Sequence, residues 1–403
     1  MERKKILYVH HSHTRGGAPR SLLFLIEQLP RQDFCMDFMC IYDEDGNRKW
    51  FEKYAENFYF SRYSAPFHGS TVCQTNSIKQ LFVQIVRIPL TVLDSAKYIK
   101  KSNADIMHLN STCLWPVALA GRIVRPKMKI VCHIREPLIN HIDGKIINYF
   151  CGRLVDAFIA IDRFDASTVN SHGKPMHIIY NAVDFTLYNS NIKSNELRCE
   201  LGLDKNDIIF LYLARVSVSN GAYEMITHVG DVIKKNPRIH FVIMGAFLEK
   251  PDEYTNKVIE AANAYKSNVH ILPFRTNVPS IIASSDVMVV PFTQPHFARS
   301  IIEAAAMGVP SLGSDIGGPQ ELIINNKTGL LFDHDSYTDF ADKCLAMAQK
   351  EIRTQMSKAA IEFAEEFFDS VKNSNKTFDV YKDLTKNKKQ HKGTNHNCSK
   401  LKT

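Results

Sequence analysis

The stretch that decides the fold is residues 286–313, DVMVVPFTQPHFARSIIEAAAMGVPSLG. It begins with the apolar run 286–290 and passes through a loop. A helical pattern then runs from about Arg299 to Met307, and a second predicted strand occupies 310–313. Continuous apolar strands joined through a helix are typical of a parallel sheet that is covered on both faces. The stretch therefore predicts a strand-helix-strand unit.

The same alternation recurs in two series along the chain. Apolar runs occupy 5–10, 36–42, 105–109, 129–134 and 157–161 in the first half and 208–214, 239–245, 269–273, 286–290 and 310–313 in the second. Helical spacing is clear in 18–29 and 222–235. The predicted fold class is α/β, with two doubly wound Rossmann-like domains that face a central cleft.

The chain has 403 residues, whereas a single core stops growing near roughly 250 to 300 residues. We expect an N-terminal domain over residues 1–185, a C-terminal domain over 186–385 and a disordered, lysine-rich tail over 386–403. The aromatic residues of 354–384 need a covering surface. A return of the final helix onto the first domain would provide it.

The formal charge of +8 is concentrated at the chain end, where residues 386–403 carry six lysines and no acid. The rest of the chain is nearly neutral, which argues against nucleic acid as a partner. Nine cysteines without a C-x-x-C pair fit reduced thiols. We expect neither a signal peptide nor a membrane-spanning helix, and a cytoplasmic location.

Glycine pairs follow two of the predicted strands, where parallel sheets bind their ligands. Gly16-Gly17 follows the first strand and Gly317-Gly318 a late one. Such a pair lets the backbone approach a phosphate at a helix start, although a bare pair is about as often a tight turn.

Two features could suggest a metal. His10, His11 and His13 lie together but without a nearby acid or cysteine, and the acidic run Asp43-Glu44-Asp45 formally contains Asp-x-Asp. We interpret the histidines as lining a cleft and the acids as a solvated turn. No metal and no other cofactor are expected.

The second half places Arg215 at the end of the strand 208–214, and Glu303 one turn inside the helix that follows residues 291–298. A fixed cation beside a helix start suits a diphosphate. A carboxylate there can accept paired hydrogen bonds from ribose hydroxyls. Taken alone, Arg215 could be an ordinary surface arginine and Glu303 an ordinary solvated glutamate. The interpretation therefore depends on Arg215, Glu303 and the helix start occurring together.

In this order the motifs resemble the retaining glycosyltransferases of the GT-B fold, family four. The matching segments are Ala214-Arg-Val-x-x-x-Asn-Gly221, Phe297-Ala-Arg-x-x-x-Glu303-Ala-x-Ala-x-Gly308-x-Pro310, Asp315-x-Gly-Gly318 and Lys327-Thr-Gly-Leu-Leu331. The likeness covers about residues 5–385 and is strongest over 208–333. It implies an N-terminal acceptor domain and a C-terminal nucleotide-sugar donor domain.

The resemblance also implies site residues. Arg215 would hold the donor diphosphate, Glu303 the ribose, and His133 would approach the donor sugar from the first domain; these three are the expected catalytic residues. The expected donor-binding residues are Gly16 and Gly17 across the cleft, Asn220, Arg275 near the base, the amides of Ala298, Arg299, Ser300 and Ile301, and Glu303 itself.

Two positions depart from the family pattern. Asn220 stands where the family usually has lysine, and Pro295 where it usually has a glutamate, eight residues before Glu303. A missing phosphate contact of this kind would lower the rate about 10²- to 10³-fold. We predict that Arg299, in the first turn of the helix, partly replaces the missing cation.

The expected reaction is metal-independent transfer of a hexose from a nucleotide sugar to a saccharide or lipid-linked acceptor, with retention, in surface polysaccharide or glycolipid biosynthesis. Peripheral contact with the inner face of a membrane is expected through the tail and residues 81–101. The alternative is a catalytically weakened or inactive glycosyltransferase-like binding subunit, favoured by Asn220 and Pro295. A dinucleotide-dependent oxidoreductase is disfavoured because no G-x-G-x-x-G follows a predicted strand.

Overall fold

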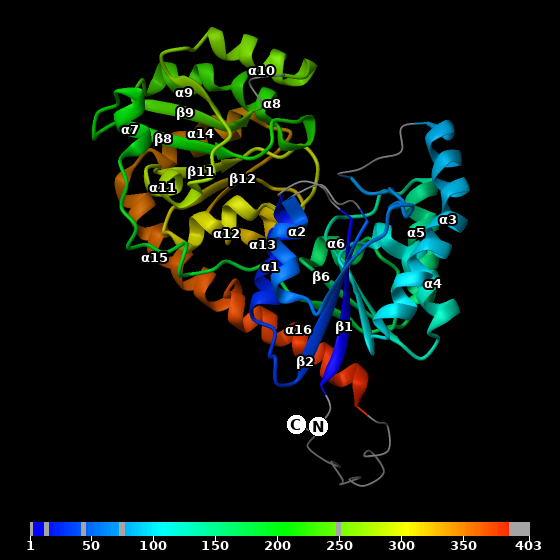
Figure 1. The fold of residues 1–403 in the computed structure, drawn as a ribbon. Helices are drawn as coiled ribbons and strands as arrows, with labels where there is room; N and C mark the ends of the chain where they lie inside the picture. The colour runs from blue at the N-terminus through cyan, green and yellow to red at the C-terminus, as the bar shows by residue number, and fades with distance from the viewer. Residues whose placement is uncertain (1–2, 12–15, 42–45, 72–76, 247–250, 387–403) are drawn as a thin grey trace, which may run out of the picture.

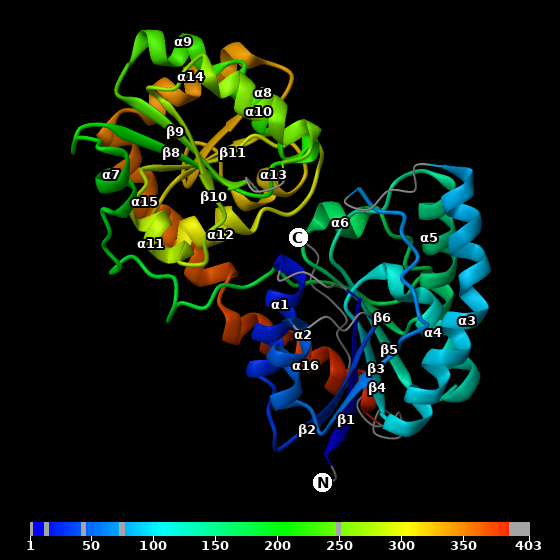
Figure 2. The ribbon, with the colours of Figure 1, turned by 45° about the horizontal axis from the view of Figure 1, so that its top comes forward.

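The computed structural model describes residues 3–11, 16–41, 46–71, 77–246 and 251–386. The chain forms two parallel sheets with helices on both faces, and the two halves lie next to one another (Figure 1). Figure 2 shows the same halves after a turn of 45°. The predicted α/β class with two doubly wound sheets is confirmed.

The first sheet has seven strands in the order β3-β2-β1-β4-β5-β6-β7, and all neighbours are parallel. The strands are β1 (Lys4–His10), β2 (Phe34–Cys40), β3 (Asn57–Phe60), β4 (Ile106–Leu109), β5 (Lys129–Ile134), β6 (Ala157–Ala160) and β7 (Met176–Ile178). Strand order reverses between β1 and β4, so a ligand crevice is expected beyond their carboxyl ends.

Helices of the first half cover both faces of this sheet. They are α1 (Gly17–Glu27), α2 (Gly46–Phe51), α3 (Ile78–Ser102), α4 (Trp115–Val124), α5 (Ile142–Leu154) and α6 (Arg163–Ser167), with short 3-10 turns η1 (Glu52–Tyr54) and η2 (Thr112–Leu114). The long helix α3 begins at the capping side chain of Ser77 and ends at Asn103, which has a left-handed backbone. No helix of the described residues is long and apolar enough to cross a membrane.

The second sheet has six parallel strands in the order β10-β9-β8-β11-β12-β13. They are β8 (Ile208–Leu213), β9 (Ile239–Ala246), β10 (Val269–Pro273), β11 (Val287–Val290), β12 (Ser311–Ser314) and β13 (Gly329–Phe332). The order reverses between β8 and β11. This reversal places the second crevice beyond the strands that precede Arg215 and the loop 291–298.

The helices of the second half include one correction to the sequence prediction. They are α7 (Glu196–Leu201), η3 (Val218–Asn220), α8 (Ala222–Ile226), α9 (Val229–Lys235), α10 (Glu253–Asn263), α11 (Val278–Ala283), α12 (Arg299–Ala306), α13 (Gly318–Leu322), α14 (Tyr337–Met347) and α15 (Lys350–Phe367). The single helix predicted over 222–235 is wrong. The chain breaks at Thr227 and His228, where the Thr227 hydroxyl donates to the Glu224 carbonyl instead of continuing one helix.

The last helix, α16 (Ser370–Thr385), lies against the first sheet, far from the sheet that precedes it in the chain (Figure 1). Phe378 and Tyr381 are buried there in one cluster with Tyr8 and Phe34. The aromatic residues of the C-terminal region thus find their cover on the first domain. Apart from Lys386, the predicted tail lies outside the described residues, as do His13 and the acidic run Asp43–Asp45.

Candidate active site

Two loops meet at the point where the strand order of the second sheet reverses. Arg215 follows β8, and the loop 291–298 follows β11. Two backbone N–H groups of this loop donate to the Ser219 carbonyl at 3.1 and 3.4 Å. Gly221 permits the approach, because its φ is 70° and a Cβ there would lie 1.8 Å from the Pro291 carbonyl oxygen. The two loops therefore form one structural unit.

Asn220 and His296 link these loops through side chains. Asn220 Nδ2 donates to the Arg215 carbonyl at 2.6 Å, and Asn220 Oδ1 lies 2.8 Å from His296 Nε2. On the other side of the ring, His296 Nδ1 lies 2.9 Å from the Gln294 carbonyl. The ring stacks on Phe292 with 3.8 Å between centroids. Burial lowers the pKa of His296 to about 4, and the nearby Arg215 acts in the same direction.

Arg215 has a free guanidinium at the mouth of this unit. Its side chain is exposed and makes no hydrogen bond or ion pair within the described residues. Beside it, α12 begins after Ala298 without a side-chain cap. The N–H groups of Arg299 and Ser300 are therefore available to an anion, whereas Ile301 N reaches back to the Ala298 carbonyl at 3.3 Å. A cation and uncapped helix amides together suit a diphosphate.

Glu303 is buried on α12 and paired with Arg299. The Arg299 guanidinium donates to Glu303 Oε1 at 3.0 and 3.2 Å, to Ser21 Oγ at 2.9 Å and to the Ala182 carbonyl at 3.2 Å. Ser21 and Ala182 belong to the first half, so Arg299 joins the two halves. Glu303 Oε2 has no hydrogen-bond partner in the described part of the chain and remains free to accept from a hydroxyl.

Glycines from both halves approach the same place. A Cβ on Gly17 would lie 3.0 Å from Arg299 Cδ, which puts the start of α1 against the start of α12. A Cβ on Gly318 would lie 2.4 Å from the His296 carbonyl oxygen. Gly17, Gly318 and the 291–303 segment therefore meet at one junction, next to the loop that carries Arg215. Gly16 precedes α1 in extended conformation at the same corner.

His133 lies at this junction on the first-half side. Its Nδ1 is 3.3 Å from His108 Nε2, and His108 Nδ1 is 2.7 Å from the Tyr381 hydroxyl on α16. His133 Nε2 is buried without a hydrogen-bond partner in the described residues. It lines a small cavity that Ser21 and Ala182 also line. The two groups that bind Arg299 thus lie beside the expected catalytic histidine.

The imidazoles of His108 and His133 are both neutral near pH 7. Burial lowers the pKa of His108 to about 3, and burial together with nearby Arg135 lowers that of His133 well below its ordinary range. Each ring therefore carries one N–H. If the Tyr381 hydroxyl donates to His108 Nδ1, the proton of His108 lies on Nε2 and is donated to His133 Nδ1. The proton of His133 then lies on Nε2, on the side of the cavity. The C-terminal helix is thereby coupled to the tautomer of His133.

Two family models match this chain. The model described as glycosyl transferases group 1 matches residues 193–363, and the model described as glycosyltransferase family 4 matches residues 15–187. The chain belongs to glycosyltransferase family 4. Its fold is the GT-B fold of that family.

Named relatives match almost the whole length of this family 4 chain. The UDP-Gal:alpha-D-GlcNAc-diphosphoundecaprenol alpha-1,3-galactosyltransferase of Escherichia coli is 23% identical over 401 residues, which cover 95% of this chain and 98% of the relative. Anabaena HepE, solved with UDP and glucose, superposes with a TM-score of 0.74 at 20% identity over 94% of this chain and 100% of that one. A glycosyltransferase of Rickettsia africae gives a TM-score of 0.76 at 19% identity, covering 96% and 100%.

Arg275, which we expect to lie near the nucleotide base, is in the loop after β10. Its guanidinium is held by Glu200 and Glu196 of α7, with Nη1 2.7 Å from Glu200 Oε2. This bidentate pair fixes Arg275 at the outer side of the second sheet. Contact of Arg275 with a base stays a prediction.

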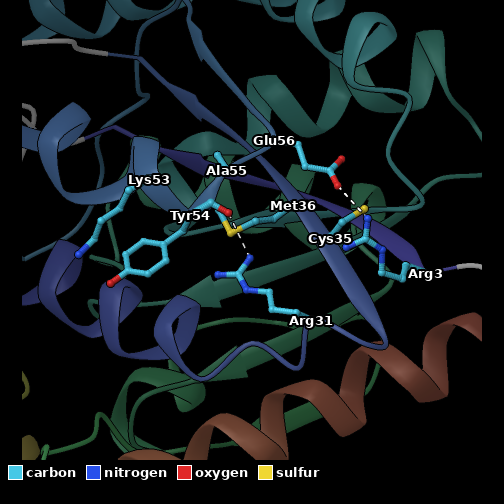
Figure 3. A pocket seen from close by; sticks show the side chains of 8 residues that line it. All are labelled: Arg3, Arg31, Cys35, Met36, Lys53, Tyr54, Ala55 and Glu56. Atoms are coloured by element: carbon cyan, nitrogen blue, oxygen red, sulfur yellow. Dashed lines mark hydrogen bonds and ion pairs between the residues drawn. The ribbon is translucent and has the colours of Figure 1, made fainter.

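Another pocket lies away from this junction. A hollow of about 380 Å³ lies near the start of β2, at the edge opposite the strand ends (Figure 3). Its cations already have partners: Arg31 donates to the Tyr54 carbonyl at 3.1 Å and Arg3 to Glu56 at 3.2 Å. The third cation that lines it, Lys53, lies over the Tyr54 ring with its Nζ 4.7 Å from the centroid. Because these cations already contact protein groups, the strand-end junction is the better candidate site.

Acidic groups lie near the strand ends of both halves. Asp162 and Asp165 are buried after β6, and burial raises the pKa of Asp162 to about 6, with Glu321 acting in the same direction. Among the described residues, Asp315, Asp333 and His334 have ligand atoms within 4.8 Å of one another and form the one group that could hold a metal. Asp333 and His334 are exposed, and His334 Nδ1 already lies 2.9 Å from Asp315 Oδ1.

Sequence reasoning missed several residues of this junction. Arg135 is half-buried and donates to Asn110 Oδ1 at 2.9 and 3.0 Å and to Asn181 Oδ1 at 2.7 Å. Glu321 accepts from the Tyr180 hydroxyl at 2.6 Å and so ties α13 to the first half. Arg135 could have been found from its place directly after an apolar strand. The partner of Glu321 is 141 residues away in the chain and left no local signal.

Proposed function

We propose that the chain transfers a hexose from a nucleotide sugar to a saccharide or lipid-linked acceptor, with retention of anomeric configuration and without a metal. The convergence of Arg215, the uncapped start of α12 and Glu303 carries this proposal. During transfer, negative charge grows on the departing diphosphate. Arg215 and the α12 amides would stabilise that charge, while Glu303 Oε2 would hold the ribose.

The named relatives support this choice of substrates. The Escherichia coli relative takes UDP-Gal and a diphosphoundecaprenol-linked acceptor, and HepE was solved with UDP and glucose. We infer a role in surface polysaccharide or glycolipid biosynthesis from the same likeness.

The test begins with thermal shifts by UDP, GDP and ADP, followed by turnover of the matching nucleotide sugars. Arg215→Ala should lower kcat about 10²- to 10³-fold. Arg238→Ala is the matched control, since Arg238 is an exposed arginine at the opposite edge of the same sheet. Binding of no nucleotide, or equal effects of the two variants, would refute the proposal. The anomeric coupling constant of the product in proton NMR tests retention.

The second candidate is a binding subunit that holds a nucleotide without turning it over. Asn220 is committed to hydrogen bonds inside the protein, and Arg299 is committed to Glu303 and to the first half. Neither residue points a free charge at the leaving group. Nucleotide binding without hydrolysis or transfer, across the nucleotide sugars that bind, would favour this candidate.

The outer face of α3 suits a membrane surface and supports a lipid-linked acceptor. Its exposed residues include Phe82, Val86, Leu90 and Leu93, the last exposed to 72%. The helix also carries five lysines and arginines but one acid, Asp94. Asp94 accepts from Ser61 Oγ at 2.7 Å and from Tyr63 N at 3.0 Å, so its carboxylate is turned toward the protein. An apolar stripe with flanking cations is the pattern of a helix that lies on anionic lipid.

Cosedimentation with vesicles tests this contact. The wild type should bind vesicles that contain an anionic phospholipid and bind neutral vesicles weakly, because both apolar burial and charge contribute. The double variant Phe82→Ser, Leu93→Ser should no longer cosediment with these vesicles. Val371→Ser with Ile324→Ser, exposed apolar residues outside α3, should still do so. Equal binding by both double variants would contradict the assignment of α3.

A further inference from the structure

The ring of His296 is held between two oxygen atoms. Asn220 Oδ1 lies 2.8 Å from Nε2 and the Gln294 carbonyl 2.9 Å from Nδ1. The amide orientation of Asn220 is fixed, because its other end lies 2.6 Å from the Arg215 carbonyl, which can only accept. A neutral imidazole has one N–H and can satisfy one of these oxygens. An imidazolium would satisfy both.

The charge around His296 opposes this protonation while the site is empty. The influences on its pKa are burial, which lowers it, the Gln294 carbonyl, which raises it, and Arg215, which lowers it. The result is a pKa of about 4. The neutral ring then leaves one close N···O contact without a hydrogen. A dianionic diphosphate bound at Arg215 would cancel the repulsion and favour the charged ring.

We propose that His296 becomes an imidazolium when the donor binds and serves as the second cation for the donor diphosphate, beside Arg215. The proton comes from solvent and is released again with the nucleotide. Asn220 is a positioning residue, since its amide orients the ring through Oδ1. Both ring N–H groups are used within the protein, so His296 acts on the diphosphate through its charge. Stacking on Phe292 at 3.8 Å also suits a cation.

This inference rests on the proposed function, because it needs a nucleoside diphosphate at Arg215. It also gives a role to Asn220, the residue that departs from the family pattern. The lysine that the family usually has is absent, but the asparagine in its place holds a second titratable group at the same corner. A cation would then be present during transfer and absent from the empty site.

Calorimetry of UDP binding in two buffers with different ionisation enthalpies tests the proposal. At about pH 7.5, where the terminal phosphate of free UDP has almost entirely lost its proton, the wild type should take up protons as UDP binds. His296→Gln should abolish the uptake, weaken UDP about tenfold and lower kcat with the nucleotide sugar about tenfold or more. UMP, which carries one phosphate, should cause less uptake. Thermal melting of each variant shows that the fold is intact.

Two outcomes separate this inference from the proposed function. UDP binding without proton uptake overturns the role of His296 and leaves the transferase proposal standing. Failure of UDP, GDP and ADP to bind overturns both. Rescue gives an independent check: adding Asn220→Lys to His296→Gln supplies a permanent cation and should restore kcat without restoring proton uptake. Failure of this rescue in a folded double variant also counts against the charge role of His296.

Discussion

Replacing Arg299 by alanine should destabilise the protein strongly, because Arg299 neutralises a buried carboxylate at the junction of the halves. The side chains of Arg299 and Glu303 are exposed to 14% and 7%, and their closest atoms are 3.0 Å apart. Removing one partner of a buried ion pair costs about 3 to 5 kcal/mol. The hydrogen bonds to Ser21 and Ala182 are lost as well. At about 2 to 4 °C per kcal/mol for a domain of this size, the Tm should fall by roughly 6 to 20 °C.

The assay is denaturant unfolding of Arg299→Ala, Glu303→Gln and the double variant. Since most of the penalty is the orphaned charge, adding Glu303→Gln to Arg299→Ala should recover part of the loss. Lys358→Ala is the control, because Lys358 and Glu362 form an i,i+4 pair on α15 at 4.0 Å with both side chains exposed. That pair should contribute no more than about 0.5 kcal/mol.

The same variant tests whether Arg299 replaces the missing diphosphate cation. A Tm within about 1 °C of wild type would refute the junction argument, since no buried charge would then have been orphaned. Turnover is measured at saturating nucleotide sugar, well below the Tm. If stability falls but turnover stays intact, Arg299 does not replace the missing diphosphate cation. Loss of turnover in the folded variant supports the replacement.

Two further changes probe the junction. Tyr381→Phe should shift the tautomer of His133, seen in nitrogen-15 NMR, and lower kcat more than it changes KM; an unchanged His133 spectrum would disprove the coupling through His108. Asp165→Asn should raise stability at pH 8 by about 1 to 3 kcal/mol. Burial, together with neighbouring Asp162, raises the pKa of Asp165 well above its ordinary range, so its contribution to stability is present below the unfolded-state pKa of about 4 and is lost as pH rises through the folded-state value. The gain should therefore shrink toward pH 4, and an equal gain at both pH values would contradict this origin.

The sequence predicted the apolar parallel strands well and the irregular elements poorly. Runs such as 129–134 and 208–214 match β5 and β8 to within one residue, because buried parallel strands are apolar along their whole length. The edge strands β3, β7 and β13 were missed, since each has only three or four residues, and β3 and β7 are only partly buried. The break between α8 and α9 was missed because the apolar period continues across it.

In the candidate site, likewise, some residues could be placed from the sequence but their contacts could not. Arg215, Gly17 and the start of α12 could be placed from motifs, because parallel topology brings strand ends together whatever the distance along the chain. The partners of these residues could not be placed. Pairing of Arg299 with Glu303 follows from helical spacing, but its reach to Ser21 and Ala182 depends on how the two halves meet. No local pattern records that contact.

The junction also couples donor binding to the arrangement of the halves. Arg299 occupies Oε1 of Glu303 and, with the same guanidinium, holds Ser21 and the Ala182 carbonyl. A ribose that bonded only to Oε2 would leave these contacts in place, and the halves would stay together. A ribose that displaced Arg299 from Oε1 would free the guanidinium and loosen the tie to the first half. Because Arg299 fixes the carboxylate from one side and leaves the other oxygen open, the first mode requires no loss of buried pairing and is the one that the geometry favours.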